Sequence, residues 1–347
     1  MKKRVLIAVL NWGLGHATRS ETIISEVLSA NCDVFLASSG SALSYLKNRF
    51  PSLPAHPLPD KEVLYTQKSA LPGLIKRGLY QSGINKKQKI WTDAFIADNG
   101  ITHIISDNVY GVWSARIPSA LISHQLGLLS PVFKNAINRR LAKWINNFSE
   151  VWVPDVAGSD SIAGKMLINN HLETEVQFLG NCSRFSETTG LEKTIDYLAV
   201  LSGAEPLRTF LERQILDVFS RLEGKKVLLR GKESSPQKEL GTDIIGMANS
   251  DQMRDLILKS ELVICRSGFT SVSDLLKLNA KALLIPTPGQ PEQEYLAKRC
   301  RDKNWFDYTI QKKLTPDVAR KAFSKRVSET KPTSVWNGSA ILEKFLT

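Results

Sequence analysis

Short apolar runs alternate with stretches of helical periodicity along almost the whole chain. In the first half, the runs lie at residues 5–10, 34–38, 103–107, 119–123 and 151–154. A second series lies at residues 197–201, 227–230, 243–246, 262–265 and 282–286. Nearly continuous apolar runs indicate buried strands, and the intervals are long enough for crossover helices. The pattern therefore predicts an α/β fold with parallel sheets covered on both faces.

Two series of strands predict two α/β domains with a cleft between them. The stretch VPDVAGSDSIAGK, rich in Gly, Ser and Asp, separates the series. We accordingly expect domains at residues 1–156 and 157–332. Residues 333–347 contain SVWNGSAILEKFLT, which predicts a final short helix.

Two further segments are less regular or more strongly charged. Residues 61–88 show no clear periodicity and predict a mobile basic loop or a frayed helix. Residues 130–148 place apolar side chains on one helical face and Lys or Arg on the remainder. Such a helix either lies in an anionic membrane surface or packs on a core with its basic face in water.

The composition of the 347 residues, 42% hydrophobic and 23% charged, is that of a globular protein. No apolar run approaches the roughly 20 residues that span a bilayer. The start, MKKRVLIAVLNWG, resembles a signal peptide only briefly, because its apolar stretch is short and no small-residue cleavage site follows. We expect a cytoplasmic protein, with peripheral contact to the membrane as an open alternative.

The spacing of the cysteines indicates which metal or disulfide sites are excluded, and the net charge indicates the kind of binding partner. The four cysteines are far apart and form no C-x-x-C pair, which argues against a zinc site or a disulfide framework. The 46 basic and 34 acidic residues give a net charge of +12, which favours an anionic partner. The basic residues are not interleaved with aromatic ones in one stripe, so we expect no nucleic acid.

The turn NWGLGHATRS follows the first strand and opens a helix. Gly13-x-Gly15-x-x-Thr18 approximates a dinucleotide fingerprint, but that fingerprint needs an acid at the end of the second strand. The second strand ends in Ser38 and Ser39 instead. The alternatives left are a tight turn that merely needs glycine and a turn that presents His16 to a substrate.

The most specific pattern lies at residues 261–298. A strand ends in Arg266-Ser267-Gly268, and a helix containing Asp274 begins at Thr270 or Ser271. The N–H groups and positive end of such a helix suit a diphosphate, and a carboxylate one turn on suits a ribose. An ordinary strand-to-helix turn is the alternative.

The next strand leads into PTPGQPEQEY, where Gln290, Glu292, Gln293 and Glu294 gather after a Pro/Gly turn. Carboxylates and carboxamides pair with the O–H groups of a polyol. We therefore expect this loop to hold a sugar.

Polar residues also follow two strands of the first half. Asp107 and Asn108 end one strand, and His124 and Gln125 end the next. Open α/β sheets bind ligands at this edge. Asp107 is an alternative to His16 as the base, and His124 with Gln125 form either an acceptor-binding pair or two polar caps.

The stretch CRSGFTSVSDLL…IPTPGQPEQEY resembles the nucleotide-sugar-binding half of family 28 glycosyltransferases. That group includes the peptidoglycan N-acetylglucosaminyltransferase and the galactolipid synthases. Its G-x-G-G-H turn is similar to Gly13, Gly15 and His16, although Leu14 interrupts the glycines. The loop at residues 199–212 is similar to the family's glycine loop. The resemblance implies the GT-B fold, two Rossmann-like domains facing a cleft, with the final helix returning to the first domain.

Residue roles follow from the resemblance. The N-terminal domain would bind the acceptor, and the C-terminal domain would bind the nucleotide sugar. The acceptor side would comprise Gly13, Gly15, Asn108, His124 and Gln125, with His16 or Asp107 catalytic. The donor side would comprise Gly203, Arg208, Arg266, Ser267, Gly268, Thr270, Ser271, Asp274, Gln290, Gln293 and Glu294, with Glu292 nearby. Asp274 stands where the family has Glu, and Ser271 aligns best with the family's Thr.

The resulting expectation is an inverting glycosyltransferase that needs no metal or other cofactor, since the sequence has no D-x-D pair. It would move a hexose or N-acetylhexosamine from a UDP-sugar to a lipid-linked or other glycan. Its partners would be the nucleotide sugar, a glycan or glycolipid acceptor and an anionic membrane surface. The alternatives are a nucleotide-sugar 2-epimerase of the same fold and a non-catalytic nucleotide-sugar-binding protein.

Overall fold

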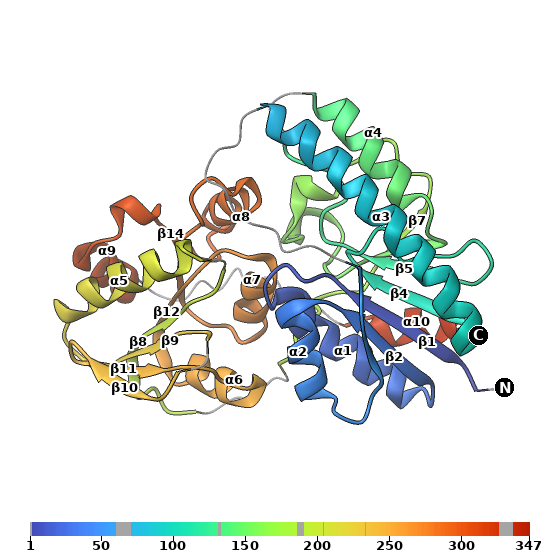
Figure 1. The fold of residues 1–347 in the computed structure, drawn as a ribbon. Helices are drawn as coiled ribbons and strands as arrows, with labels where there is room; N and C mark the ends of the chain where they lie inside the picture. Colours follow the sequence, from blue (N-terminus) through green and yellow to red (C-terminus); the bar gives the residue numbers. More distant parts are fainter. Residues whose placement is uncertain are drawn as a thin grey trace. The chain divides into compact units, whose positions relative to one another are not determined.

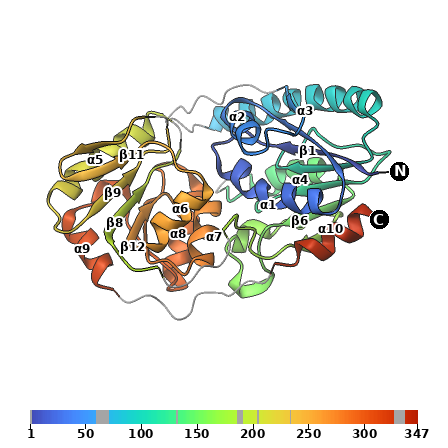
Figure 2. The same cartoon turned by 90° about the horizontal axis from the view of Figure 1, so that it is seen from below.

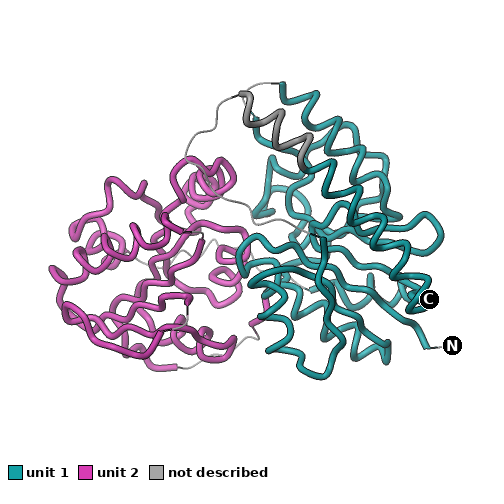
Figure 3. Tube along the Cα trace, viewed as in Figure 1, with its two compact units in different colours: residues 1–182, 334–347 teal, residues 183–333 magenta. Residues whose placement is uncertain are grey.

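The computed structural model describes residues 2–59, 71–130, 133–185, 191–203, 205–232, 234–325 and 336–347. The chain divides into two compact units (Figures 1 and 3). Unit 1 comprises Met1–Cys182 and Ser334–Thr347, and unit 2 comprises Ser183–Thr333.

The described residues of unit 1 form a seven-stranded parallel sheet in the order β3-β2-β1-β4-β5-β6-β7. Residues of β1 alternate between two core clusters, one on each face of the sheet. This is why its sequence is a continuous apolar run. The strands are β1 (Arg4–Val9), β2 (Asp33–Ser38), β3 (Ala55–Pro57), β4 (His103–Asp107), β5 (Ser119–Ile122), β6 (Glu150–Val153) and β7 (Glu175–Phe178).

Helices cover both faces of this sheet. Figure 2 shows α1 and α10 on one side of the strands and α3 on the other. The described helices of unit 1 are α1 (Gly15–Ser29), α2 (Gly40–Arg49), α3 (Leu71–Asn99), α4 (Lys134–Ile145) and α10 (Gly338–Leu346), with short 3₁₀ turns at Gly158–Asp160 and Gly164–Leu167.

Helix α10 belongs to unit 1 although it follows unit 2 in the chain. The Phe345 ring packs edge-on against Trp152 of β6 and against His103 of β4, with centroids 5.0 and 5.3 Å apart. Leu342 and Leu346 join the same buried cluster. The core of unit 1 is therefore completed from both ends of the described chain.

The described residues of unit 2 form a second seven-stranded sheet, in the order β10-β11-β9-β8-β12-β13-β14. All pairings are parallel except that of the edge strand β10 with β11. The strands are β8 (Ile195–Val200), β9 (Lys226–Leu229), β10 (Gln237–Glu239), β11 (Thr242–Ile245), β12 (Ser260–Cys265), β13 (Ala282–Leu284) and β14 (Asp307–Tyr308).

Helices of unit 2 connect these strands. The apolar faces of α5 and α9 pack in one cluster with β8, β9 and β12. The helices are α5 (Leu207–Ser220), α6 (Ser250–Leu258), α7 (Phe269–Lys277), α8 (Pro291–Asp302) and α9 (Pro316–Ser324), with a 3₁₀ turn at Gln311–Lys313.

The predicted α/β class is confirmed, and each of the ten predicted strands overlaps a strand of the structure. Strands β3, β7, β10 and β14 were not predicted, because they are short edge strands without buried residues and so leave no apolar run in the sequence. The units divide after Cys182, beyond the expected boundary at residue 156, because β7 pairs with β6 of unit 1.

Residues 71–88 of the irregular basic segment are helical and form part of α3, so the helix alternative holds there. Residues 61–70 lie outside the described residues. In the part of the chain that the structure describes, no helix has both the length and the apolar composition needed to span a bilayer.

Candidate functional site

The strand order of unit 1 reverses between the neighbouring strands β1 and β4. In open α/β sheets, ligands bind outside the carboxyl ends of the strands at such a reversal. Strand β1 leads into the turn before α1, and β4 ends at Asp107. Side chains from α1 and from the end of β4 therefore lie where a ligand is expected.

The turn before α1 depends on Gly13. Its φ is +70°, a conformation that favours glycine. An added Cβ would meet no atom within 4 Å, so the backbone conformation and not crowding requires glycine. Gly15 and His16 then become the first two residues of α1.

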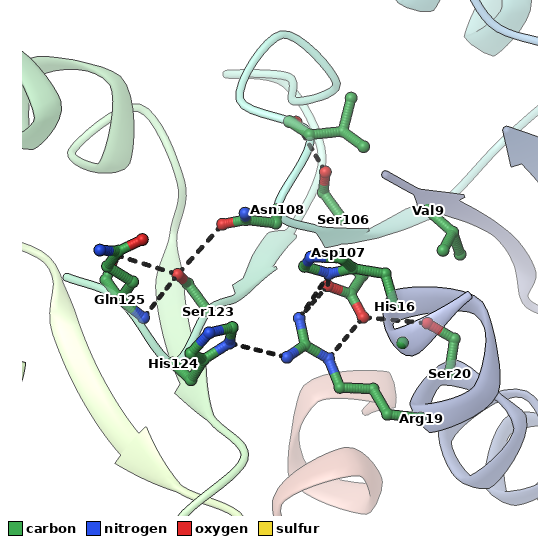
Figure 4. A network of polar contacts seen from close by, with 12 residues as sticks. Val9, His16, Arg19, Ser20, Ser106, Asp107, Asn108, Ser123, His124 and Gln125 are labelled. Atoms are coloured by element: carbon green, nitrogen blue, oxygen red, sulfur yellow. Dashed lines mark hydrogen bonds and ion pairs between the residues drawn. The ribbon is translucent and has the colours of Figure 1, made fainter. Parts of the chain in front are cut away.

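The carboxylate of Asp107 is fully buried and receives hydrogen bonds from α1 (Figure 4). Arg19 forms a fork on it, with Nε 2.8 Å from Oδ2 and Nη2 on Oδ1. The Ser20 hydroxyl donates to Oδ2 at 3.0 Å. His16 Nδ1 lies 2.7 Å from Oδ1. The first two turns of α1 thus supply every described side-chain partner of this carboxylate.

His16 Nδ1 also lies 2.8 Å from Arg19 Nη2. A guanidinium only donates and a carboxylate only accepts, so the partner of Nδ1 depends on the tautomer. With its proton on Nδ1, the ring donates to Asp107 and keeps a lone pair on Nε2. That is the form a general base requires.

Charge and burial set the protonation of this pair. Burial lowers the pKa of His16. The Asp107 charge opposes this effect and the Arg19 charge adds to it, so that the pKa of His16 lies below its ordinary value. Burial alone would raise the pKa of Asp107, but Arg19 and His16 hold it well below its usual range. At neutral pH, Asp107 is therefore charged and His16 is neutral.

A second polar group continues from the same edge of the sheet. Asn108 is left-handed (φ +59°), and its Oδ1 accepts hydrogen bonds from the Tyr110 hydroxyl at 2.9 Å and the Ser123 hydroxyl at 3.1 Å. The Gln125 N–H donates to Ser123 Oγ at 3.1 Å. The expected acceptor residues Asn108 and Gln125 are thus joined through Ser123.

His124 joins the first group through Arg19. Arg19 Nη1 lies 2.9 Å from His124 Nδ1, and the rings of His16 and His124 have centroids 6.3 Å apart (Figure 4). The structure therefore gathers both predicted catalytic residues and His124 around one guanidinium.

The sequence reasoning missed Arg19 and Ser20. The available signal was the spacing H-A-T-R, because residues three apart share a helix face. A histidine and an arginine on one face can approach the same buried acid.

The strand order of unit 2 reverses between β8 and β12. Gly203 follows β8 with a φ of +101°. Gly231 follows β9 with a φ of +69°, and an added Cβ there would lie 2.6 Å from the Leu201 carbonyl oxygen. Close backbone approach thus requires glycine beside this reversal.

Arg208 is buried under the loop after β8. Its Nε donates to Glu205 at 2.9 Å and its Nη1 to Glu212 at 2.8 Å. Arg230 Nε donates to the other oxygen of Glu212 at 2.7 Å. The Arg208 guanidinium is thus held by carboxylates of its own unit, and its expected contact with the donor stays a prediction.

Arg266 is only 1% exposed. Its Nη1 donates to the carbonyls of Ile285 and Pro286 at 3.3 and 3.1 Å, and its Nη2 reaches Gln311 Oε1 at 3.0 Å. These contacts tie the end of β12 to neighbouring loops. The Nη atoms of Arg266 thus have acceptors within unit 2, and its donor contact stays a prediction.

The start of α7 is built from the predicted S-G-x-T-S stretch. Ser267 is buried and donates to the Gln293 carbonyl oxygen at 2.8 Å. Gly268 is the N-cap residue, and an added Cβ would meet no atom within 4 Å. Thr270 and Ser271 lie in the first turn and are partly exposed. The helix end thus has open space beside it.

Asp274 lies one turn further into α7 and is buried. It accepts a hydrogen bond from the Ser183 hydroxyl at 2.6 Å, and Arg184 Nε lies 3.9 Å from its carboxylate. The expected ribose contact therefore already has partners at the start of unit 2.

The loop before α8 is held by its own side chains. Gln293 Oε1 accepts from the Thr287 N–H at 2.9 Å, and Glu294 Oε1 accepts from the Gly289 N–H at 3.1 Å. Gln290 is the N-cap residue of α8, which Glu292 follows in the first turn. The cluster expected to bind a sugar thus forms one ordered turn.

Unit 2 also contains a hollow that the sequence reasoning missed. The buried Ser234 hydroxyl has no hydrogen-bond partner among the described groups. Strand β11 ends at this hollow, at the same edge as the loops above. Its lining comprises Ser234, Ser235, Pro236, Ile245, Gly246 and Met247.

Helix α4 packs its apolar face on unit 1. Leu141, Ile145 and Phe148 are buried in one cluster with β6. Phe133, at the start of the helix, is 68% exposed. The core-packed alternative therefore describes most of residues 133–148.

No group of three or more His, Cys, Asp or Glu side chains suited to a metal gathers within the described ranges.

Residues 203–332 match the family model described as Glycosyltransferase family 28 C-terminal domain. The glycotransferase of kitacinnamycin is similar over 99% of this chain and 95% of its own, with 13% identity and a TM-score of 0.64. MurG of Acinetobacter baumannii has 16% identity, covers 93% of this chain and 90% of its own, and has a TM-score of 0.57.

The spinosyn rhamnosyltransferase SpnG complexed with thymidine diphosphate is also similar. The identity is 12%, the shares covered are 93% of this chain and 88% of that one, and the TM-score is 0.59. A search of curated sequences gives no match. At such identities the solved structures establish the fold, whereas the family model describes most of unit 2.

The Asp107→Asn substitution tests the buried charge. It leaves the Arg19 guanidinium without its anion, so we expect a loss of about 3 kcal/mol in the free energy of unfolding at pH 7. The folded pKa of Asp107 lies below the unfolded value of about 3.9. Its stabilisation is thus complete above roughly pH 4 and is lost as pH falls through the folded pKa.

Urea unfolding at several pH values measures both effects. Asp33→Asn is the control, because Asp33 pairs with Lys2 at the surface; we expect it to cost less than about 0.5 kcal/mol. Equal stability of Asp107→Asn and wild type at pH 7 would contradict the buried ion pair.

Proposed function

We propose that the chain is an inverting, metal-independent glycosyltransferase, because residues 203–332 match the family 28 C-terminal domain and the whole chain has the fold of solved glycosyltransferases. It transfers a hexose or N-acetylhexosamine from a UDP-sugar to a hydroxyl of a lipid-linked or other glycan. The observation that carries this proposal is the pairing of His16 with buried Asp107 at the strand reversal of unit 1.

His16 is the base in this proposal, and Asp107 orients it. A base must touch the acceptor hydroxyl, and Asp107 has no exposed surface whereas the His16 side chain is 13% exposed. The lowered pKa of His16 supports this role, since the neutral ring is the form that takes a proton.

The transfer itself is a single displacement. The acceptor oxygen forms a bond to the anomeric carbon while the bond from that carbon to the diphosphate oxygen breaks. The acceptor proton moves to His16 Nε2, and the bonding electron pair leaves with the diphosphate. Attack opposite the leaving group inverts the anomeric configuration.

Unit 2 binds the donor in this proposal. The N–H groups and positive end of α7 stabilise the diphosphate, with Gly268 allowing close approach. Asp274 meets the ribose, and the loop before α8 meets the sugar hydroxyls. The open hollow near β11 accommodates the nucleotide's uracil ring, and the Ser234 hydroxyl, which has no partner among the described groups, is available to it. The donor contacts proposed from the sequence are Gly203, Arg208, Arg266, Ser267, Gly268, Thr270, Ser271, Asp274, Gln290, Gln293 and Glu294.

Unit 1 binds the acceptor in this proposal, and three exposed apolar side chains on linked segments, called the apolar patch below, support a lipid-linked acceptor. Leu128 and Ile168 are exposed, and their segments are tied together by Asn169, whose Nδ2 donates to the Leu126 carbonyl. Phe133 begins the helix whose Asn138 accepts from the Leu128 N–H at 2.8 Å. The exposed side chains of Lys134 and Lys165 lie in the same parts of the chain, next to Phe133 and close to Ile168 in sequence. Apolar and basic side chains together suit an anionic bilayer.

The His16→Ala variant tests the base. We expect kcat for transfer from UDP-sugars to glycan or glycolipid acceptors to fall at least about 100-fold, while UDP affinity stays unchanged. His171→Ala is the control, because His171 lies outside the site. Product mass and anomeric configuration by NMR separate transfer from epimerisation, and wild-type turnover in His16→Ala would contradict the assignment.

Gly268→Ala tests the diphosphate site. The added methyl fits beside the protein atoms, since it meets none of them within 4 Å. A diphosphate packed on the start of α7 would collide with it, so we expect UDP affinity to fall about tenfold with unchanged thermal stability. Calorimetric titration measures the affinity. Gly83→Ala, also without neighbours in unit 1, should bind UDP normally; equal affinity in both variants would remove α7 from the site.

The double substitution Phe133→Ser with Ile168→Ser tests the patch. We expect it to lower co-sedimentation with phosphatidylglycerol vesicles several-fold, because the apolar anchors are lost. Leu240→Ser is the control, since Leu240 is a similarly exposed apolar residue of unit 2. Binding that is equal in all three proteins, or absent in wild type, argues for an acceptor presented away from a membrane.

A further inference from the structure

Arg19 contacts three titratable side chains of the site, Asp107, His16 and His124. It is 2% exposed and forms a fork on Asp107. The same guanidinium reaches Nδ1 of His124 at 2.9 Å and Nδ1 of His16 at 2.8 Å (Figure 4). Both histidines therefore face one donor through the same ring nitrogen.

The two ring nitrogens have different neighbours beyond Arg19. His124 Nδ1 meets the guanidinium, which can only donate, so this nitrogen accepts and the ring proton sits on Nε2. His16 Nδ1 meets both the guanidinium and the Asp107 carboxylate. Since Arg19 already directs its fork at the carboxylate, the charged oxygen is the stronger partner for His16, and Nδ1 donates to it.

We propose that Arg19 is a positioning residue that fixes opposite tautomers in the two histidines. His16 carries its proton on Nδ1 and presents a lone pair at Nε2. His124 carries its proton on Nε2. The tautomers stand on the contacts alone, whereas their catalytic meaning rests on the proposed function.

Opposite tautomers give the two rings complementary tasks. The lone pair of His16 accepts the proton of the attacking hydroxyl. The Nε2–H of His124 is a donor, and its ring lies 6.3 Å from that of His16. This pair suits an acceptor that carries a second oxygen beside the attacking hydroxyl, as a sugar diol does.

Arg19 also limits how strongly Asp107 favours a protonated His16. The charged and titratable groups that face His16 are Arg19 on α1, Asp107 on β4 and His124 after β5. Tyr110, near the same group, stays neutral, because burial raises its pKa to about 12. Burial lowers the pKa of His16 most, and the Arg19 charge partly offsets the rise that the Asp107 charge causes, so His16 stays unprotonated below the pH at which a His–Asp pair without the arginine would charge.

Nitrogen-15 NMR of the full-length chain, labelled at its five histidines, tests the tautomers directly. We expect the Nδ1–H form for His16 and the Nε2–H form for His124 at pH 7, assigned with the His16→Gln and His124→Gln variants. The Nε2–H form of His16, the Nδ1–H form of His124, or a charged ring in either would overturn the proposal. The spectrum needs no substrate, so this failure is distinct from absence of transfer.

Arg19→Gln and Arg19→Lys test whether Arg19 fixes the two tautomers and lowers the pKa of His16. Gln removes the charge, so we expect the His16 pKa and the acid limb of kcat/KM to rise by about one unit. Lys keeps the charge, so we expect a smaller rise, while His124 loses its single tautomer in both variants. An unchanged pKa and unchanged tautomers in Arg19→Gln would overturn the role of Arg19.

Arg49→Gln is the matched control. Arg49, at the end of α2, forms its ion pair with Glu21 of α1, the helix that carries Arg19. We expect its histidine spectrum and pH profile to match wild type. If Arg19→Gln does not fold, Arg19→Lys and the wild-type spectrum still decide the proposal.

Discussion

A carboxylate without exposed surface constrains the whole edge of unit 1. Removing an ion from water costs several kcal/mol unless partners replace the water. Asp107 receives those partners from the first turns of α1, as a guanidinium fork, a hydroxyl and an imidazole. Helix α1 therefore has to start where it does and face β4. The same contacts that make burial tolerable also fix the chemistry of His16.

Much of this arrangement follows from sequence. The alternation of apolar runs predicts two parallel sheets, and the topology then brings the ends of β1 and β4 together. His16 and Asp107 are 91 residues apart in the chain, yet both could be selected because each follows a predicted strand. The polar stretches of unit 2 were found in the same way, since they also lie at carboxyl ends of strands.

Side-chain direction is what sequence left open. Arg208 and Arg266 follow strands as expected, but internal carbonyls and carboxylates hold both guanidinium groups. A basic residue at a strand end can donate hydrogen bonds to a ligand or to the carbonyl and carboxylate groups of a neighbouring loop. The sequence does not show which acceptors lie within reach. Arg19 shows the converse, because a helical arginine that resembled a surface residue is buried with the site. The short strand β7 likewise moved the unit boundary, since its pairing with β6 leaves little trace in the pattern.

The discontinuity of unit 1 affects how the chain can fold. Helix α10 covers the sheet of unit 1 through Phe345, but it follows all of unit 2 in the chain. During synthesis the first sheet must therefore wait, with part of its apolar face uncovered, while the second unit emerges and can already fold. Unit 1 is therefore synthesised first but completed last. Its apolar surface, exposed until α10 has been synthesised, is a natural target for a chaperone.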